Sequence, residues 1–432
     1  MSDRHRQDGT QVTRRSVLRQ LAGGAAVAGG AALARRAFAA EDALLESLIR
    51  QNQQAEFGQN FDSASRTILM PKASLPTLSA ATVETTEQAI GQYAAIVARG
   101  GWPAVPPVER LRLGNRHPSV GALRRRLAAV GDLDTASGAT DIFDSYVEAA
   151  VRRFQARHGL NVDGIVREQT FKALNAPAEA RLTQLRTNLG RLRSFTGNLG
   201  SRFVMCNIPA AQIEAIENGV AVSRHTGVVG KPDRPSPEIS SRITEINFNP
   251  FWTVPVSIVR RDLIPKMQAE PDYLTKNHIR IFDQRRQELQ PAQVNWYSEE
   301  AVNYQFKQDP GDFNSLGSIR INFPNPHQVY MHDTPFKNLF GEDFRFHSSG
   351  CVRIQNVREL VYWLLAETPG WPRVEIDRVI RTAERKDARL ARPVSLSWVY
   401  VTAWATPDGV VQFRDDIYGR DGLGAVANTS SG

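Results

Sequence analysis

The stretch that decides the fold is residues 330–354, YMHDTPFKNLFGEDFRFHSSGCVRI. The alternation of Val329 and Met331 with polar neighbours predicts a buried strand that ends close behind His332. Cys351 follows in a Ser-Ser-Gly-Cys run, where small side chains leave the thiol and the nearby backbone N–H groups approachable. Thiol acyl transfer needs an imidazole beside a thiol and N–H donors for the developing oxyanion. The stretch therefore predicts a nucleophilic cysteine paired with a histidine.

The same stretch resembles the catalytic motif of L,D-transpeptidases, the YkuD-type enzymes that cross-link peptidoglycan. In that family a His precedes a Ser/Thr-His-Gly-Cys element by a similar interval. The resemblance covers most of the chain after residue 40, in the long, multi-domain branch of the family. Ser349 stands where many members have the His of His-Gly-Cys, so the role of a second imidazole stays open.

The resemblance implies that Cys351 attacks the carbonyl of the L-centred third residue of a tetrapeptide stem, expels D-Ala and forms a thioester. An amine of a second stem then resolves the thioester. His332 would activate the thiol and protonate the leaving amine, while the N–H groups of Gly350 and Cys351 are candidates for the oxyanion hole. The residues expected to contact substrate are Tyr330, Ser349, Arg353 and Trp252.

Arg353 has two equally weighted interpretations, a bidentate partner of a substrate carboxylate or half of a structural ion pair. The resemblance implies no cofactor and no metal. It also implies that carbapenems acylate Cys351, because a thiolate paired with His332 should open a strained β-lactam amide.

The expected fold class is α+β. The resemblance places a β-rich catalytic domain at residues 198–420, with a capping insertion over the active site at about 256–316. Short apolar or alternating runs separated by Gly, Asn and Pro predict strands of this domain. These runs are residues 202–208, 220–229, 243–248 and 318–323. An apolar pattern at 357–367 predicts a helix after the cysteine loop, and residues 399–404 a final strand.

Apolar residues at helical spacing predict a helical unit at residues 108–175. They are Val120, Leu123, Leu127, Val130, Val147, Val151, Phe154, Thr170 and Leu174. The unit resembles the three-helix peptidoglycan-binding domain attached to many wall enzymes, and a purely structural bundle is the alternative. A scaffold at 40–107 and a returning helix at 176–197 flank it, which would make the unit an insertion. His158 is expected to cap a helix or lie at the surface, and residues 421–432 to form a flexible tail.

Residues 1–39 read as a twin-arginine export signal. Arg14 and Arg15 precede a weakly apolar run at 21–34, and Ala37-Phe38-Ala39 offers a cleavage site. This run is too short to cross about 30 Å of hydrocarbon at about 1.5 Å per residue. No later segment offers eighteen apolar residues. We expect a periplasmic protein without a transmembrane anchor.

The formal net charge of +8 permits anionic partners. No Lys/Arg run carries interleaved aromatics, so the excess reads as solvated surface and no nucleic-acid partner is expected. Cys206 lies in the apolar run 202–208 and reads as a buried packing residue rather than a disulfide partner of Cys351.

Two other function classes remain as alternatives. His327, His332, His347 and Cys351 could form the ligand set of a zinc-dependent wall peptidase. Their spacing is poor for this, because Ser-Ser-Gly between His347 and Cys351 favours a loop, and no C-x-x-C or H-E-x-x-H motif is present. A non-catalytic peptidoglycan-binding protein is the second alternative, although a packing cysteine needs no Gly-Cys turn. A metal assay separates these classes.

Overall fold

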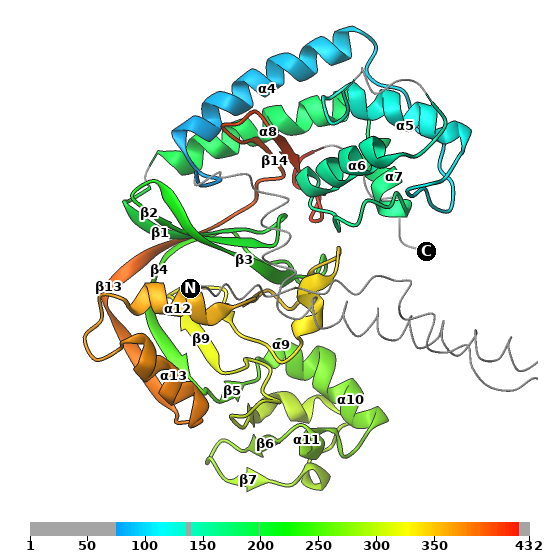
Figure 1. Ribbon diagram of the computed structural model, residues 1–432. Coiled ribbons are helices and arrows are strands. Elements are labelled where there is room, and N and C mark those ends of the chain that lie inside the picture. Colours follow the sequence, from blue (N-terminus) through cyan, green and yellow to red (C-terminus); the bar gives the residue numbers. More distant parts are fainter. Residues whose placement is uncertain (1–74, 135–139, 198, 423–432) are drawn as a thin grey trace, which may run out of the picture. The chain divides into compact units, whose positions relative to one another are not determined.

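The computed structural model describes residues 75–134, 140–197 and 199–422. The expected export signal at 1–39 lies outside the described residues, as does most of the expected tail. Within the described ranges, no helix combines the length and the apolar character needed to cross a membrane. Among the described residues, helices dominate 80–196 and a large β ladder is built from strands within 202–399, in agreement with the expected α+β class (Figure 1).

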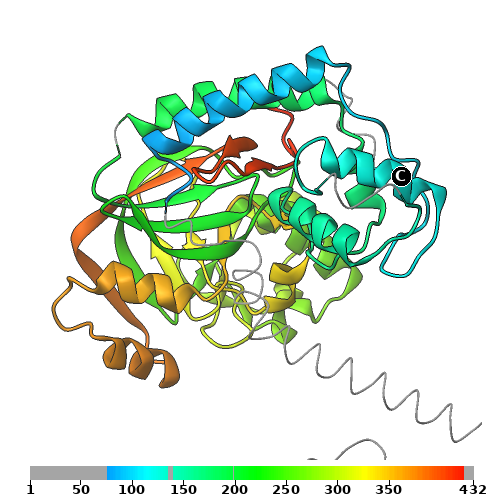
Figure 2. The same cartoon turned by 45° about the horizontal axis from the view of Figure 1, so that its top comes forward.

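Two long helices, α4 (Ala80–Ala98) and α8 (Ala178–Thr196), lie side by side in both ribbon views (Figures 1 and 2). The side chain of Ser79 caps α4 by accepting a hydrogen bond from the N–H of Thr82. Both helices share an apolar core with the short hairpin β14 (Ala403–Ala405) and β15 (Val411–Phe413) near the end of the chain. The two scaffold segments thus meet although about eighty residues separate them in sequence.

The chain between α4 and α8 forms a compact unit with its own core. Its helices are α5 (Pro118–Ala128), α6 (Ser145–Arg157) and α7 (Glu168–Leu174), as the apolar spacing predicted. Val120, Leu123, Val151 and Phe154 are at most 1% exposed and pack together. We call residues 108–175 the three-helix module.

The three-helix module packs against β15 through His158. The imidazole stacks on Phe154 with ring centroids 3.8 Å apart and on Phe413 at 5.6 Å. Arg414 strengthens this junction by donating to the carbonyl of Arg157 at 3.0 Å. His158 is the C-cap residue of α6, but it is buried rather than at the surface, because β15 covers it.

The β ladder has the strand order β11-β3-β12-β10-β9-β4-β13-β1-β2. Because β2 also pairs with β3, eight of these strands close on themselves and β11 is an additional strand on β3. The strands are β1 (Arg202–Asn207), β2 (Gln212–Glu217), β3 (Val220–Gly230), β4 (Ile239–Phe248), β9 (Ile319–Asn322), β10 (Met331–His332), β11 (Phe346–Ser348), β12 (Val352–Ile354) and β13 (Lys386–Val399).

One side of the ladder forms the main hydrophobic core. Cys206 is fully buried there, so its interpretation as a packing residue is confirmed, and both cysteines are free thiols. Helix α12 (Val357–Leu365) contributes Leu360 and Leu364 to the same core, as expected, and α13 (Arg373–Arg381) follows it.

The expected final strand at 399–404 is wrong in its bounds. The long strand β13 instead ends at Val399, and β14 begins only at Ala403. The sequence did not predict strand β13, because the strand contains Pro393 and a proline usually interrupts the hydrogen bonding of a β ladder. The structure resolves the conflict with a register shift between Arg389 and Val394, where the proline interrupts no pairing.

The insertion after β4 has its own core and its own sheet. Short helical segments follow one another as α9 (Val256–Ile258), η2 (Val259–Leu263), α10 (Ile264–Ala269) and α11 (Tyr273–Lys276). They pack on a four-stranded sheet in the order β5 (Trp252–Thr253), β8 (Gln305–Gln308), β6 (Ile279–Phe282) and β7 (Glu288–Leu289). The sequence indicated helical and polar stretches here but not this sheet, because its strands have only two to four residues.

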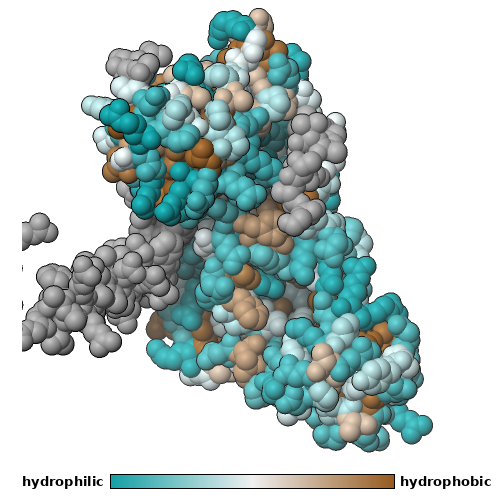
Figure 3. Space-filling model, turned by 90° about the vertical axis from the view of Figure 1, so that its right-hand side faces the viewer, coloured by the Kyte–Doolittle hydropathy of each residue, from teal (hydrophilic) through white to brown (hydrophobic). Residues whose placement is uncertain are grey.

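Large apolar side chains on the surface are scattered. Figure 3 shows mostly polar residues on the face it displays, with apolar residues in small separate patches. Tyr297 of the insertion is 82% exposed and Tyr146 of the three-helix module 66%. Isolated exposed rings of this kind are ordinary for a soluble surface.

Candidate active site

The predicted base lies on β10, and the predicted nucleophile directly precedes the neighbouring parallel strand β12. Met331 of β10 pairs with Val352 of β12, and His332 with Arg353. Met331 and Val352 are fully buried in the main core. Because successive side chains in a strand point to opposite faces, His332 and Arg353 lie on the other face, as does Cys351. The ladder therefore brings the two sequence-predicted groups to one surface.

Side-chain hydrogen bonds fix the turn that carries the thiol. Ser348 Oγ donates to the carbonyl of Cys351 at 2.5 Å, and the N–H of Gly350 donates to Ser348 Oγ at 3.2 Å. Ser236 Oγ donates to the carbonyl of Gly350 at 2.8 Å. Gly350 has φ of +113°, a conformation that other residues rarely adopt. Of the two N–H groups expected in the oxyanion hole, that of Gly350 is thus already bonded.

Cys351 is held as a thiol. Burial raises its pKa to about 11, although the backbone N–H and the hydroxyl of Tyr330 favour the thiolate. The charges of Arg320 and Arg353 act in the same direction as Tyr330 but do not outweigh burial. At neutral pH the sulfur is therefore protonated and needs a base at the moment of attack.

His332 is 5% exposed and uncharged. Its Nδ1–H donates to the backbone carbonyl of Asp333, which leaves Nε2 as the basic nitrogen. Burial, together with the positive charges of Arg353 and Arg320, lowers the pKa of the imidazole to about 3. The carbonyl of Asp333 is thus the group that orients the base. Within the described ranges, no hydrogen bond joins the His332 ring to the Cys351 thiol.

These protonation states predict the pH dependence of thiol alkylation. With a thiol pKa near 11, the thiolate fraction of Cys351 grows about tenfold per pH unit between pH 7 and 10. The iodoacetamide rate constant of the free protein should rise in parallel, as followed by intact mass. A rate that levels off between pH 6 and 8 would contradict the protonated thiol and indicate a preformed thiolate–imidazolium pair.

The insertion contacts the site at two points. Trp252 of β5 faces the hydroxyl of Tyr330 and lowers the pKa of that phenol, although burial raises it more. On the other side, Arg234 donates to Ser349 Oγ at 3.1 Å and pairs with Asp262 of η2. These contacts bring two of the residues expected to bind substrate, Trp252 and Ser349, to the candidate site.

Of the two interpretations of Arg353, the structural ion pair is wrong for the described residues, and the substrate-carboxylate partner stays a prediction. Among the residues that the structure describes, it forms no ion pair, and its Nε is buried without a hydrogen-bond partner. Its Cζ lies 5.9 Å from the centroid of the Phe336 ring. The guanidinium is thus available for an anionic group.

Sequence reasoning missed Arg320. This residue of β9 pairs with His332 in register, and its Cζ lies 4.4 Å from the centroid of the Tyr330 ring. The signal that could have found it is the antiparallel pairing of the two strands. Eight residues connect them, and a connection of this length does not define the register from sequence.

The histidines of the zinc alternative do not converge. His347 Nε2 lies 2.9 Å from Glu342 Oε2 and 2.8 Å from the carbonyl of Phe344, whereas His327 is exposed on the loop before β10. In the described part of the chain, no group of three or more His, Cys, Asp or Glu side chains is arranged to hold a metal ion.

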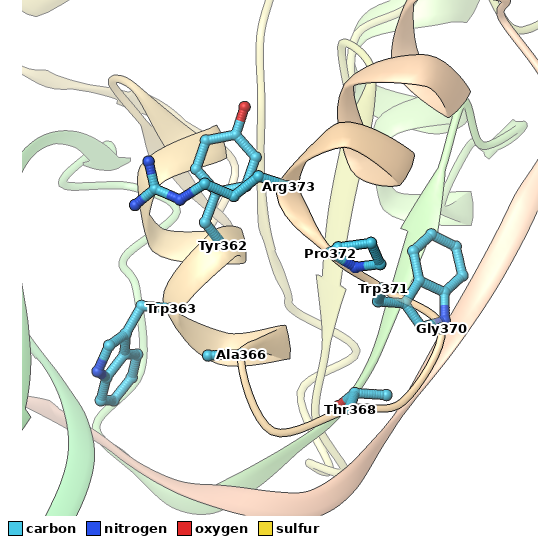
Figure 4. A pocket seen from close by; sticks show the side chains of 8 residues that line it. All are labelled: Tyr362, Trp363, Ala366, Thr368, Gly370, Trp371, Pro372 and Arg373. Atoms are coloured by element: carbon cyan, nitrogen blue, oxygen red, sulfur yellow. The ribbon is translucent and has the colours of Figure 1, made fainter.

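A separate pocket of about 500 Å³ lies along α12, α13 and the loop between them. None of the candidate site residues lines it. Figure 4 shows that its two tryptophan rings, Trp363 and Trp371, point away from each other. The pocket is therefore distinct from the site at Cys351.

Fold and site together define an α+β protein with a cysteine and a histidine presented side by side on a β ladder. Residues 201–376 match the L,D-transpeptidase catalytic domain YkuD, and residues 116–174 match a putative peptidoglycan binding domain. Both matches agree with the sequence motifs, which predicted a YkuD-type L,D-transpeptidase catalytic domain and a peptidoglycan-binding domain.

Two relatives match in sequence. A putative L,D-transpeptidase of Haemophilus influenzae is 32% identical over 245 residues, which are 56% of this chain and 49% of the relative. The chain thus spans about half the length of that protein. The N-acetylmuramoyl-L-alanine amidase CwlM of Mycobacterium tuberculosis is 42% identical over 74 residues, covering 15% of this chain and 18% of the relative.

Solved structures of L,D-transpeptidases are more remote. The enzyme from Stackebrandtia nassauensis aligns with 12% identity and a TM-score of 0.23, over 69% of this chain and 96% of that one. The enzyme from Mycobacterium smegmatis aligns with 11% identity and a TM-score of 0.23, over 45% and 58%. Scores this low do not establish a common arrangement, so the assignment rests on the sequence matches.

Proposed function

We propose that this protein is a peptidoglycan L,D-transpeptidase that works through a cysteine thioester. The observation that carries the proposal is the register of β10 and β12, in which His332 and Cys351 lie on one face. Hydrogen bonds hold the turn that contains Cys351. A peptidoglycan-binding domain in the same chain supports the wall as the site of action.

In the first half-reaction, Nε2 of His332 removes the thiol proton as Cys351 sulfur attacks the carbonyl of the third stem residue. The S–C bond forms, and the C–N bond to the terminal D-Ala breaks. The imidazolium then returns the proton to the leaving amine. In the resting site the imidazole is neutral and can accept a proton, and the thiol still carries the proton to be transferred.

In the second half-reaction, the amine of another stem attacks the thioester. His332 takes a proton from that amine, and the thiolate leaves and is reprotonated by the imidazolium. The N–H of Cys351 serves the oxyanion in both steps, and that of Gly350 joins it once its bond to Ser348 Oγ is released. Arg353 pairs with a donor carboxylate, and no cofactor takes part.

The insertion limits the access of water to the thioester. Trp252 contacts the Tyr330 hydroxyl, and Asp262 of the insertion pairs with Arg234, which donates to Ser349 Oγ; both contacts connect the insertion to residues near Cys351. Excluding water favours an amine acceptor over hydrolysis and strengthens the electrostatic contacts within the site. The setting that fits is the periplasm, reached by the twin-arginine route with removal of residues 1–39.

Covalent labelling tests the proposal. Incubation with a carbapenem should add one inhibitor mass to the peptide that contains Cys351, and incubation with EDTA should leave turnover of a tetrapeptide donor unchanged. Intact-protein and peptide mass spectrometry measure the first, and release of D-alanine the second. An unmodified Cys351 in reduced, folded protein, or activity lost to the chelator, would overturn the thioester proposal.

A further inference from the structure

Two arginine side chains flank the candidate nucleophile without a carboxylate partner. Arg320 and Arg353 each keep a buried Nε that has no hydrogen-bond partner, and neither joins an ion pair among the described residues. Burying a charged guanidinium is costly unless an anion compensates it, and burial lowers the pKa of Arg353. Two cations without an ion pair in one site indicate that the compensating anion comes with the substrate.

The strand register places the two cations on opposite sides of the base. Arg320, His332 and Arg353 form one row across β9, β10 and β12. Neighbouring strands lie about 4.8 Å apart, so the row separates the two arginine backbones by about 10 Å. The Arg320 guanidinium lies over the Tyr330 ring, whose hydroxyl approaches Cys351. One cation therefore lies beside the base and the other above the residue that contacts the thiol.

Among the described residues, no carboxylate forms an ion pair with either cation. His332 and Cys351 are both neutral, and Glu245 on the neighbouring strand β4 accepts from Asn247 and Asn322. The neighbouring carboxylate of Asp333 is already held by Lys337 and by Ser318, whose N–H and Oγ both lie 3.2 Å from Asp333 Oδ2. The site thus presents two unbalanced positive charges to an incoming donor.

We propose that Arg320 is a second carboxylate-binding group, so that the site selects donor peptides with two free carboxylates near the scissile bond. The inference rests on the proposed function. One carboxylate belongs to the leaving D-amino acid, and the other to the side chain of the residue whose carbonyl Cys351 attacks. Arg320 binds one of them and Arg353 binds the other, each through a planar fork of N–H donors.

The test combines the variants Arg320→Met and Arg353→Met with three donors. These are the tetrapeptide, its C-terminal amide and its third-residue side-chain amide. Arg320→Met should raise KM for the tetrapeptide about 10- to 100-fold, the range for losing charge-assisted hydrogen bonds, with little change in kcat. For one of the amide donors, the wild-type KM should be as high as the KM of Arg320→Met for the tetrapeptide. With that donor, the Arg320→Met substitution should not raise KM further. Arg353→Met should show the same relation with the other amide.

Arg389→Met is the matched control, because Arg389 is an exposed arginine of the same ladder that lies two strands from Arg320, and it should leave KM unchanged. Arg320→Lys should recover only part of the loss, since an ammonium lacks the fork. An unchanged KM in Arg320→Met, equal further losses with both amides, or a fall confined to kcat would overturn the inference while leaving the thioester proposal intact. If none of the three donors acylates the wild-type protein, both this inference and the thioester proposal are overturned.

Discussion

The Cys351→Ala variant is expected to keep its fold and to lose D-alanine release and cross-linking by at least about 10³-fold. The side chain is small and only partly exposed, and the turn around it is held by bonds from Ser348 and Ser236 that the substitution leaves in place. The loss should appear in both half-reactions, because no other described thiol lies at the site. Release of D-alanine and dimer formation, separated by chromatography, measure it.

Cys206→Ala is the matched control. That thiol is fully buried in the main core, and its substitution should cost about 1–2 kcal/mol of unfolding free energy while turnover is retained. Thermal melting of both variants separates folding from chemistry. Cross-linking by folded Cys351→Ala at a rate near that of the wild type would refute the assignment of the nucleophile.

Replacing His332 with alanine should slow acylation about 10²- to 10⁴-fold, the usual contribution of a positioned general base. The pKa values make this dependence strong, since a thiol of pKa about 11 has little thiolate at pH 7.5 without a base. The deficit should shrink as the pH rises towards 10, because hydroxide then forms the thiolate that His332 no longer generates. Single-turnover acylation followed by mass spectrometry over pH 6–10 measures both effects.

His332→Ala also leaves the carbonyl of Asp333 without its donor, which can cost about 1–3 kcal/mol of stability. His332→Asn retains a side-chain N–H donor without a basic nitrogen and should be as slow as the alanine variant while melting closer to the wild type. His327→Ala, an exposed histidine five residues upstream, should behave as the wild type. A His332→Asn enzyme with a wild-type rate would remove the general base from the mechanism.

Much of the site was predictable because its signals are local. A strand-end His332 and a Gly-Cys turn are visible in 25 consecutive residues, and strand alternation then places both on one face. The packing role of Cys206 was equally local, since an apolar run of strand length surrounds it. The orienting group of His332 was not predictable, because it is a backbone carbonyl and leaves no mark in the residue pattern.

The residues that sequence reasoning missed depend on contacts between distant segments. Arg320 enters the site only through the pairing of β9 with β10. Trp252 was expected there only from the family resemblance, because the strands of its sheet are too short to show alternation. His158 ends α6 as its C-cap, one of the two expected placements, but its burial was not predictable, because the strand that buries it begins more than 250 residues later. Tertiary contact decided each of these positions, and local propensity did not.

The packing of the three-helix module on the rest of the chain has a mechanical consequence. His158 stacks on Phe413, Arg414 bonds to the carbonyl of Arg157, and the N–H of Asn161 donates to Asp343, eight residues before the nucleophile. A module joined by a flexible linker would let the thiol sample a wide volume around its anchoring point on the wall. A module docked by buried contacts instead keeps a fixed distance between the wall-binding surface and the thiol. Under the proposed function, the spacing between the glycan that is gripped and the stem that is cut would be a property of the fold.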